Sequence, residues 1–170
     1  MKFKKITLYR EPSVREINIE ELTKFIERTF SIKVEIADNI FKDFDDRQIR
    51  QLSSFRVNNI KNPFRPHEST EDEIGFEREL CLDSSLMNST VKIEDAEDIS
   101  QVFMYDGFEL QKILRYLNDG ANGLHIIITN RLTCTFDERD GRYHARAVIC
   151  ANPAIISTTG MIEAPAKPRE

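Results

Sequence analysis

The sequence has no long run of apolar residues. No run approaches the roughly 18 residues that a helix needs to cross a bilayer. The first stretch, MKFKKITLYREP, has neither the apolar core nor the small-residue cleavage site of a signal peptide. The chain contains 3 cysteines, Cys81, Cys134 and Cys150, an odd and sparse set that is unlike a secreted disulfide framework. These absences favour a cytoplasmic protein with reduced thiols and no membrane partner.

The motifs of several enzyme classes are missing as well. The sequence contains no G-x-x-x-x-G-K-[ST], no G-x-G-x-x-G, no G-x-S-x-G and no H-E-x-x-H. The stretch HESTE at 67–71 begins like the zinc-helix motif, but its fifth residue is Glu71 and it follows Pro66 in a predicted loop. We interpret this likeness as accidental, because the motif needs two histidines one turn apart on a helix.

Excess positive charge is also lacking. The formal net charge is -5, and residues 61–120 hold 6 basic against 14 acidic side chains. A polyanion would avoid this acidic middle third, so we expect no nucleic-acid partner.

The beginning of the chain predicts a βαβ unit. Residues 3–9 and 32–37 alternate as half-buried strands do. Between them, residues 18–30 predict a helix, which Asn18 can cap with Glu21 in the third position after it. The apolar stripe of this helix consists of Ile19, Leu22, Phe25, Ile26 and Phe30. A strand, a helix and a strand within about 35 residues favour two parallel strands.

Residues 45–57 predict a second helix, followed by a loop. Ile49 and Leu52 would face inward, and Asp45 or Asp46 would lie near the positive end of the helix dipole. The next stretch, KNPFRPHEST, contains two prolines and is predicted to be irregular.

Two further helices are predicted on either side of a polar segment. Thr70 and Glu73 form a capping pattern for a short acidic helix. Residues 82–101 are polar without a clear period, and we expect a mobile segment there. Residues 105–120 have a helical apolar pattern and predict the second of these helices, with Asp106 as its N-cap.

The last third is predicted to be rich in β-structure. Residues 124–129 are apolar on both faces, as in a central strand. Residues 132–136 and 143–151 alternate, and Gly141 between them can supply the positive φ of a tight turn, so this region predicts an antiparallel hairpin. Residues 164–170 would form an exposed tail. The whole chain, 1–170, therefore predicts a single α/β domain whose mixed sheet combines the βαβ unit with the hairpin.

Four residues of the last third are of the types that bind metal ions. The candidate ligands are His125, Cys134, His144 and Cys150. No two of them form the tight local pair that is typical of zinc sites. Arg146 would share a strand face with His144 and Cys150 and repel a cation. We therefore interpret these residues as ordinary cysteines and hydrogen-bonded histidines, and expect no metal ligand and no cofactor in these residues.

No catalytic residue can be assigned from the sequence. The possible nucleophiles are Ser157, Thr158, Thr159 and Cys134, but no nucleophile motif surrounds them. The carboxylates Asp137, Glu138 and Asp140 lie on the predicted turn beside two arginines, where we expect them to be solvated.

The outer strand of the hairpin is the feature that indicates binding. An unpaired edge strand presents free N–H and C=O groups, to which an extended peptide can add as a further strand. The proposed substrate-edge residues are Tyr143, His144, Ala145, Arg146, Ala147 and Val148. The alternative is that another strand or the tail covers this edge.

The run from LHIIITNRL at residue 124 to the last residue resembles an archaeal family of uncharacterised proteins described as metallopeptidases. The stretches ITLYREP and YDGFELQKILRYL are similar to the same family, so the resemblance covers most of the chain. The order of elements also resembles the N-terminal half of archaemetzincins, in which strands form the rim of a substrate cleft.

This resemblance implies a zinc-dependent hydrolase, with zinc as the cofactor and a peptide or protein as the partner. It also implies that residues 143–151 form the cleft-edge strand. The sequence lacks H-E-x-x-H, so we expect these 170 residues alone to be catalytically incompetent. The alternative is a non-catalytic module that binds a peptide or protein on its exposed sheet edge.

Overall fold

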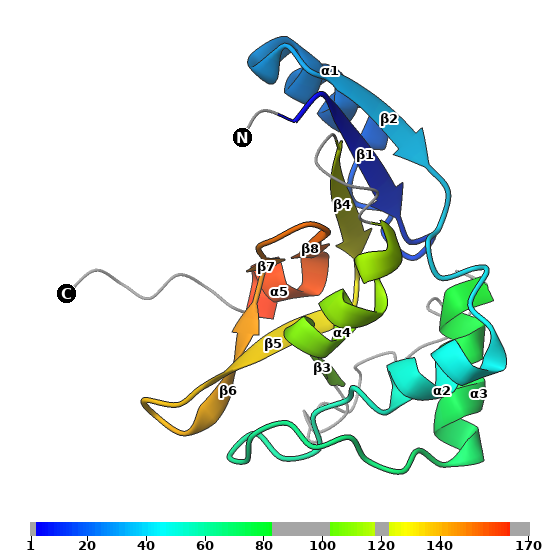
Figure 1. Ribbon diagram of the computed structural model, residues 1–170, viewed down its shortest axis with the longest axis vertical. Helices are drawn as coiled ribbons and strands as arrows, with labels where there is room; N and C mark the ends of the chain where they lie inside the picture. Colours follow the sequence, from blue (N-terminus) through cyan, green and yellow to red (C-terminus); the bar gives the residue numbers. More distant parts are fainter. Residues whose placement is uncertain (1–2, 83–102, 118–122, 164–170) are drawn as a thin grey trace.

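The computed structural model describes residues 3–82, 103–117 and 123–163, and it confirms an α/β fold (Figure 1). The larger sheet has the strand order β2–β1–β4–β8–β7. Its strands are β1 (Lys5–Arg10), β2 (Lys33–Ala37), β4 (Gly123–Thr129), β7 (Val148–Ile149) and β8 (Ala154–Ser157). The first four strands in this spatial order are parallel to one another, and β7 is antiparallel to β8 at the edge.

A second sheet of three strands has the order β3–β5–β6. Its strands are β3 (Met104–Asp106), β5 (Leu132–Asp137) and β6 (Arg142–Arg146). Strands β5 and β6 are the predicted hairpin, and Gly141 in their turn has a φ of 64°, as predicted. The hairpin thus belongs to a separate sheet and does not extend the one that contains the βαβ unit.

The βαβ prediction is confirmed. Strands β1 and β2 are parallel, and α1 (Ile19–Phe30) connects them. The Asn18 side chain accepts hydrogen bonds from the backbone N–H groups of Glu20 and Glu21. The predicted apolar stripe is only partly buried, because Phe25 and Phe30 are 52% and 67% exposed.

Helices α2 (Asp46–Ser53), α3 (Glu71–Leu82) and α4 (Gly107–Ile113) lie near their predicted positions, and the 3-10 turn η3 (Arg115–Leu117) follows α4. Helix α5 (Thr158–Glu163) was not predicted from the sequence. Helix α4 is shorter than its pattern predicted. The expected mobile segment at 82–101 lies outside the described residues except for Leu82, which ends α3, and the expected tail at 164–170 also lies outside them.

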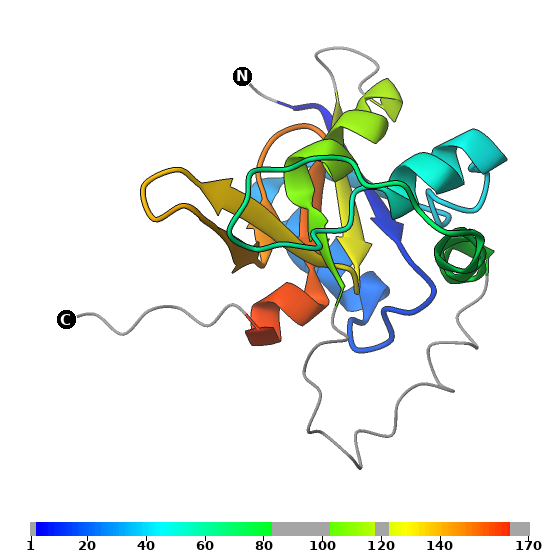
Figure 2. The same ribbon diagram turned by 90° about the horizontal axis from the view of Figure 1, so that it is seen from below.

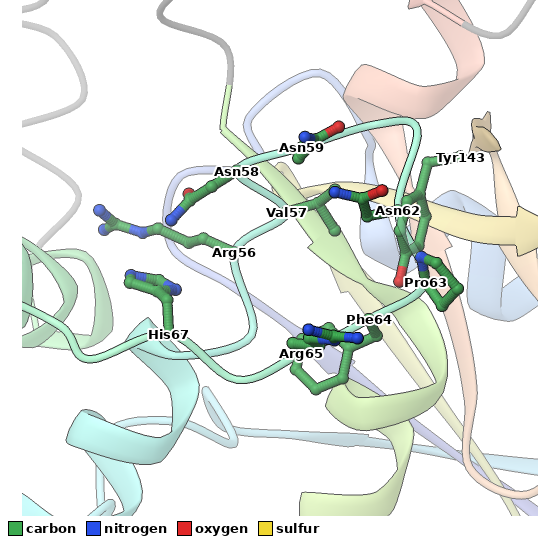
Figure 3. A pocket seen from close by; sticks show the side chains of 10 residues that line it. All are labelled: Arg56, Val57, Asn58, Asn59, Asn62, Pro63, Phe64, Arg65, His67 and Tyr143. Atoms are coloured by element: carbon green, nitrogen blue, oxygen red, sulfur yellow. The ribbon is translucent and has the colours of Figure 1, made fainter.

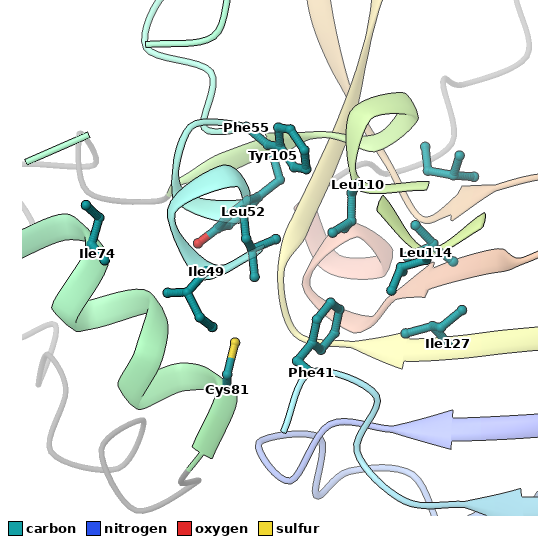
Figure 4. Packing of buried hydrophobic residues seen from close by; sticks show 12 residues of the cluster. Phe41, Ile49, Leu52, Phe55, Ile74, Cys81, Tyr105, Leu110, Leu114 and Ile127 are labelled. Carbon is teal, nitrogen blue, oxygen red and sulfur yellow. The ribbon is translucent and has the colours of Figure 1, made fainter. Parts of the chain in front are cut away.

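Apolar side chains cover both faces of the five-stranded sheet. Ile6, Leu8 and Ile128 pack toward α1 on one face, in a cluster that also contains Ile19. On the other face, Ile127 and Ile155 belong to a cluster that includes residues of α2, α3 and α4 (Figure 4). The five-stranded sheet is therefore the middle layer between α1 on one face and α2, α3 and α4 on the other.

Candidate functional site

The predicted edge strand is divided between the two sheets. Residues 142–146 form β6 and pair with β5, whereas Val148 and Ile149 form β7 and pair with β8. Ala147 lies at the crossing, where its C=O accepts a hydrogen bond of 2.9 Å from the Ser157 N–H. The single strand predicted over 143–151 is therefore two short strands with a bend between them.

Helix α5 packs against this bend. A Cβ atom added at Gly160 would lie 2.3 Å from the backbone oxygen of Arg146, so only glycine permits this approach. The Gly160 N–H donates to Ser157 Oγ at 2.8 Å, and Ser157 Oγ donates to the Arg131 C=O at 2.7 Å. Ser157, a possible nucleophile in the sequence, therefore uses its hydroxyl to link α5 to the backbone of Arg131.

The outward-facing backbone groups of β6 follow from its pairing. The Tyr143 N–H donates to the Ile60 C=O at 2.7 Å, so the backbone of Tyr143 faces away from β5. Because outward and inward positions alternate along an antiparallel strand, Ala145 also faces outward, whereas His144 and Arg146 face β5. Ala145 is only partly exposed as a residue.

Strand β7 adds one more outward position. The Ser157 N–H donates a hydrogen bond to the C=O of Ala147, the residue before Val148. In the pairing of β7 with β8, Val148 lies opposite Ile156. This arrangement makes Val148 and Ile156 a pair without mutual backbone hydrogen bonds, so the backbone of Val148 faces away from β8. Val148 is 45% exposed. Within the described residues, Ala145 in the three-stranded sheet and Val148 in the five-stranded sheet are therefore the open backbone positions of the predicted edge.

Residues 55–67, which we call the strap, cross the three-stranded sheet from one edge to the other (Figure 2). At the β3 edge, the Val57 N–H donates to the Met104 C=O at 2.7 Å. At the β6 edge, the strap supplies the Ile60 C=O that accepts from Tyr143. Among residues 3–82, 103–117 and 123–163, the strap therefore covers the predicted edge at Tyr143, and no backbone group bonds to the outer side of Ala145.

A small cleft of about 140 Å³ lies between the strap and Tyr143 (Figure 3). Its lining includes Arg56, Asn58, Asn62, Arg65, His67 and Tyr143. The Tyr143 hydroxyl donates to Asp106 Oδ2 at 2.7 Å, and Asp106 Oδ1 caps α4. This buried hydrogen bond fixes the position of Tyr143 at one end of the cleft.

The four candidate metal ligands do not come together in the described part of the chain. His125 is buried on β4 with its Nδ1 3.0 Å from the Tyr9 hydroxyl, and the Cys134 thiol on β5 contacts the Tyr105 C=O at 3.3 Å. His144 lies on β6 and Cys150 is an exposed thiol after β7. Burial raises the pKa of the Cys134 thiol, with a smaller contribution from the Asp106 carboxylate.

One group of potential ligands in the described residues lies on the hairpin turn, where Asp137, Asp140 and His144 have ligand atoms within 4.8 Å of one another. This group does not fit zinc as it is arranged. His144 Nε2 is 2.7 Å from Asp140 Oδ2, whereas two ligands of one tetrahedral zinc ion lie about 3.3 Å apart. The same carboxylate oxygen accepts a hydrogen bond of 3.0 Å from Arg142 Nε.

The turn is partly or fully exposed to solvent, as predicted. Slight burial would raise the pKa of Asp140, but its hydrogen bonds from Arg142 and His144 lower it. The turn is therefore an ion-paired surface feature.

The remaining candidates also have structural roles. Thr158 Oγ1 donates to the Asn130 side chain, and Thr159 Oγ1 donates to the Asn130 C=O at 2.6 Å. His67 of the HESTE stretch lies in the loop before α3, with its Nε2 3.4 Å from Glu73 Oε1. The zinc-helix likeness is therefore accidental, as predicted.

The sequence did not predict a buried network of ion pairs that connects the strap, α3 and the start of β5. Arg131, which precedes β5, donates from Nε to Glu11 Oε1 at 3.0 Å and from Nη1 to Glu77 Oε2 at 2.5 Å. Arg56 donates to Glu77 Oε1 from Nε at 3.0 Å and from Nη2 at 2.7 Å. Tyr105 donates to the same oxygen. The only sequence signal is that Arg131 stands between two apolar β-runs.

The charges of this network stabilise one another. Burial would raise the pKa of Glu77, but the guanidinium groups of Arg131 and Arg56 lower it. Burial raises the pKa of the neighbouring Cys81 thiol to about 12, so this thiol is unreactive at neutral pH. The network binds α3 and the strap to the sheets and leaves its carboxylates fully occupied.

The described residues define an α/β protein with open backbone positions at Ala145 and Val148, and Ala145 lies two residues from Tyr143, which lines a polar cleft. The chain matches the Probable metallopeptidase family (DUF6775) over residues 2–170 and belongs to that family. Comparison with curated proteins and with solved structures found no match. In the described residues, no helix is both long and apolar enough to cross a membrane.

Proposed function

We propose that the chain binds an extended peptide along residues 144–148 of the predicted edge, as the substrate-edge part of an archaemetzincin-like zinc metallopeptidase. The observation that carries this proposal is the outward-facing backbone of Ala145 and Val148, which follows from the bonds of Tyr143 and Ala147. Free N–H and C=O groups at a sheet edge hydrogen-bond an added strand independently of its sequence. Membership of a metallopeptidase family supports a peptide as the partner.

The arrangement of elements supports the archaemetzincin-like part of the proposal. The βαβ unit begins the chain, and the region of Ala145 and Val148 lies at a sheet edge, as the resemblance implies. We propose further that the zinc ligands and the catalytic base lie outside the described side chains. Glu11 and Glu77 are held by arginines, and in the turn cluster His144 hydrogen-bonds to Asp140.

A cytoplasmic location belongs to the same proposal. It rests on the sparse cysteines, each of which is a free thiol.

Peptides with N-methylated backbones test the strand-addition mode directly. An N-acetylated, C-amidated hexapeptide of alternating valine and threonine is made in two further forms, each methylated on alternate amide nitrogens. In an added strand, alternate N–H groups face the sheet edge, so one methylated form should lose binding and the other should keep it. Isothermal titration calorimetry measures the three affinities. Equal losses in both methylated forms would overturn the proposal, because they would show that the peptide does not bind as a strand.

The alternative function is a binding module that has no part in peptide cleavage. The same open edge favours it, and the two functions differ in their relation to zinc. The purified chain is assayed for zinc content and for cleavage of a mixed peptide pool, with and without a chelator. Chelator-sensitive cleavage by these residues alone would show that they hold a complete catalytic site, contrary to our proposal. We expect the affinity of the purified chain for the peptide to be unchanged by added zinc.

A further inference from the structure

The cleft under the strap lies directly beside the proposed peptide-binding edge. Tyr143 lines the cleft and is the outward position next to Ala145 on β6. Two residues of a strand span about 7 Å, so a peptide residue paired with Ala145 is only that far from the cleft. The Tyr143 N–H is already bonded to the Ile60 C=O, so an added strand cannot pair with it there. The peptide must leave the edge at the mouth of the cleft.

Several polar groups that line the cleft have unused hydrogen-bonding capacity. Within the described residues, the exposed Arg65 side chain makes no ion pair, and the exposed side-chain amides of Asn58 and Asn62 have no hydrogen-bond partner in the protein. His67 Nδ1 is buried and also has no partner. Figure 3 shows Asn58 and His67 at one end of the cleft and Asn62 near Tyr143 at the other.

The charge of the cleft favours an anionic ligand. Arg56 is neutralised by Glu77, and the nearby Glu73 carboxylate lies 3.4 Å from His67 Nε2 and 3.8 Å from Arg56 Nη1. Arg65 is therefore the lining cation whose charge no described acid balances. An arginine with a neighbouring amide can bind a carboxylate through charge-assisted hydrogen bonds.

The direction of the peptide determines which of its ends reaches the cleft. Strand β6 runs from Arg142 to Arg146, so a peptide antiparallel to it approaches Tyr143 with its C-terminal end. A parallel peptide would bring its N-terminal end, whose amino group would be repelled by Arg65. The charge of the cleft thus favours the antiparallel mode.

From this geometry we infer that the cleft binds a peptide carboxylate, so that the protein prefers peptides with an acidic group where they leave the edge. The inference rests on the proposed function. A free C-terminus and an acidic side chain both supply a carboxylate, and the antiparallel direction places either one at the same point. Arg65 and Asn62 provide the donors, and Tyr143 marks the end of the added strand.

The test compares three forms of the valine–threonine hexapeptide by calorimetry. The first has a free C-terminal carboxylate, the second a C-terminal amide, and the third an amide with glutamate as the next-to-last residue. We expect the first form to bind about tenfold more tightly than the second, because it gains a hydrogen-bonded charge. Tighter binding of the third form than of the second would show that a side-chain carboxylate is also accepted.

Two arginine variants make the test specific to the cleft. Arg65→Gln should abolish the preference for a carboxylate and leave the affinity for the amide form unchanged. Arg28→Gln, at an exposed position on α1, should keep the full preference. Equal affinities of the wild-type protein for all three forms, or the same behaviour of both variants, would contradict the inference.

The outcomes separate this inference from the proposed function. If the amide form binds with the expected dependence on N-methylation and the carboxylate adds nothing, only the inference fails. If no form binds, the proposed function fails as well.

Discussion

Strand β5 joins two clusters of arginines and carboxylates that differ in burial. At its start, Arg131 enters the buried network with Glu11 and Glu77. After its end, Asp140 pairs with Arg142 and His144 on the exposed turn. The residue types are similar, but only the buried charges lack water as an alternative partner. Burial therefore determines which cluster the fold depends on.

Replacement of Glu77 by glutamine should have the largest effect on stability. The variant leaves Arg131 and Arg56 buried without their shared carboxylate, which costs about 3–5 kcal/mol in comparable buried pairs. Urea denaturation monitored by circular dichroism measures the free energy of unfolding. Glu79→Gln, at an exposed position on the same helix, is the matched control. Similar losses in both variants would show that the network does not stabilise the fold.

Acid should weaken the buried network by protonating Glu77. The folded-state pKa of Glu77 is lowered from its ordinary value of 4.5, so its contribution to stability is present in full above that pH. This contribution is lost as the pH falls through the lowered pKa. We expect the unfolding free energy of the wild-type protein to fall more steeply below about pH 4.5 than that of Glu77→Gln. Parallel curves would mean that another carboxylate dominates the acid response.

Alanine substitutions at two glycines compare a tightly packed position with an open one. Gly160→Ala should destabilise the protein by about 1–3 kcal/mol, because the new methyl group meets the rigid backbone oxygen of Arg146. Gly75→Ala on α3 has open space and should stabilise the helix by about 0.5–1 kcal/mol. The midpoints of urea denaturation report both effects. Stabilisation by Gly160→Ala would show that α5 does not pack against the bend as described.

The smallest effect is expected at the exposed turn. Asp140→Asn should leave the urea midpoint unchanged within error, because exposed ion pairs contribute little. It should also leave the zinc content of the protein unchanged, since the turn does not fit zinc as it is arranged. Loss of bound zinc in this variant, measured by elemental analysis, would identify the turn as a metal site after all.

Local patterns predicted much of the fold. The βαβ unit depends on strand alternation and on the Asn18 cap, and the hairpin depends on Gly141, so each signal lies within a few residues of its structure. The division of the edge strand was not predictable in this way. It arises because Ser157 bonds to Ala147 and α5 packs at Arg146, and both contacts come from residues that follow the strand.

The site was less predictable than the fold. The sequence indicated residues 143–148 as an edge, but Tyr143 is bonded to Ile60, which lies far away in the sequence and has no recognisable motif. The same limit applies to the buried network, where Glu11 and Arg131 are 120 positions apart. Charged residues beside apolar runs show that a buried partner is needed, but not which residue supplies it.

The central claim is that the backbone of Ala145 and Val148 is open to an added strand. Amide hydrogen exchange, followed residue by residue by nuclear magnetic resonance, measures this most directly in the presence and absence of the C-amidated valine–threonine hexapeptide. We predict that saturating peptide slows exchange at Ala145 or Val148 and leaves the Tyr143 amide, already bonded to Ile60, unchanged. Unchanged exchange at both Ala145 and Val148, with the peptide shown to be bound, would contradict the claim.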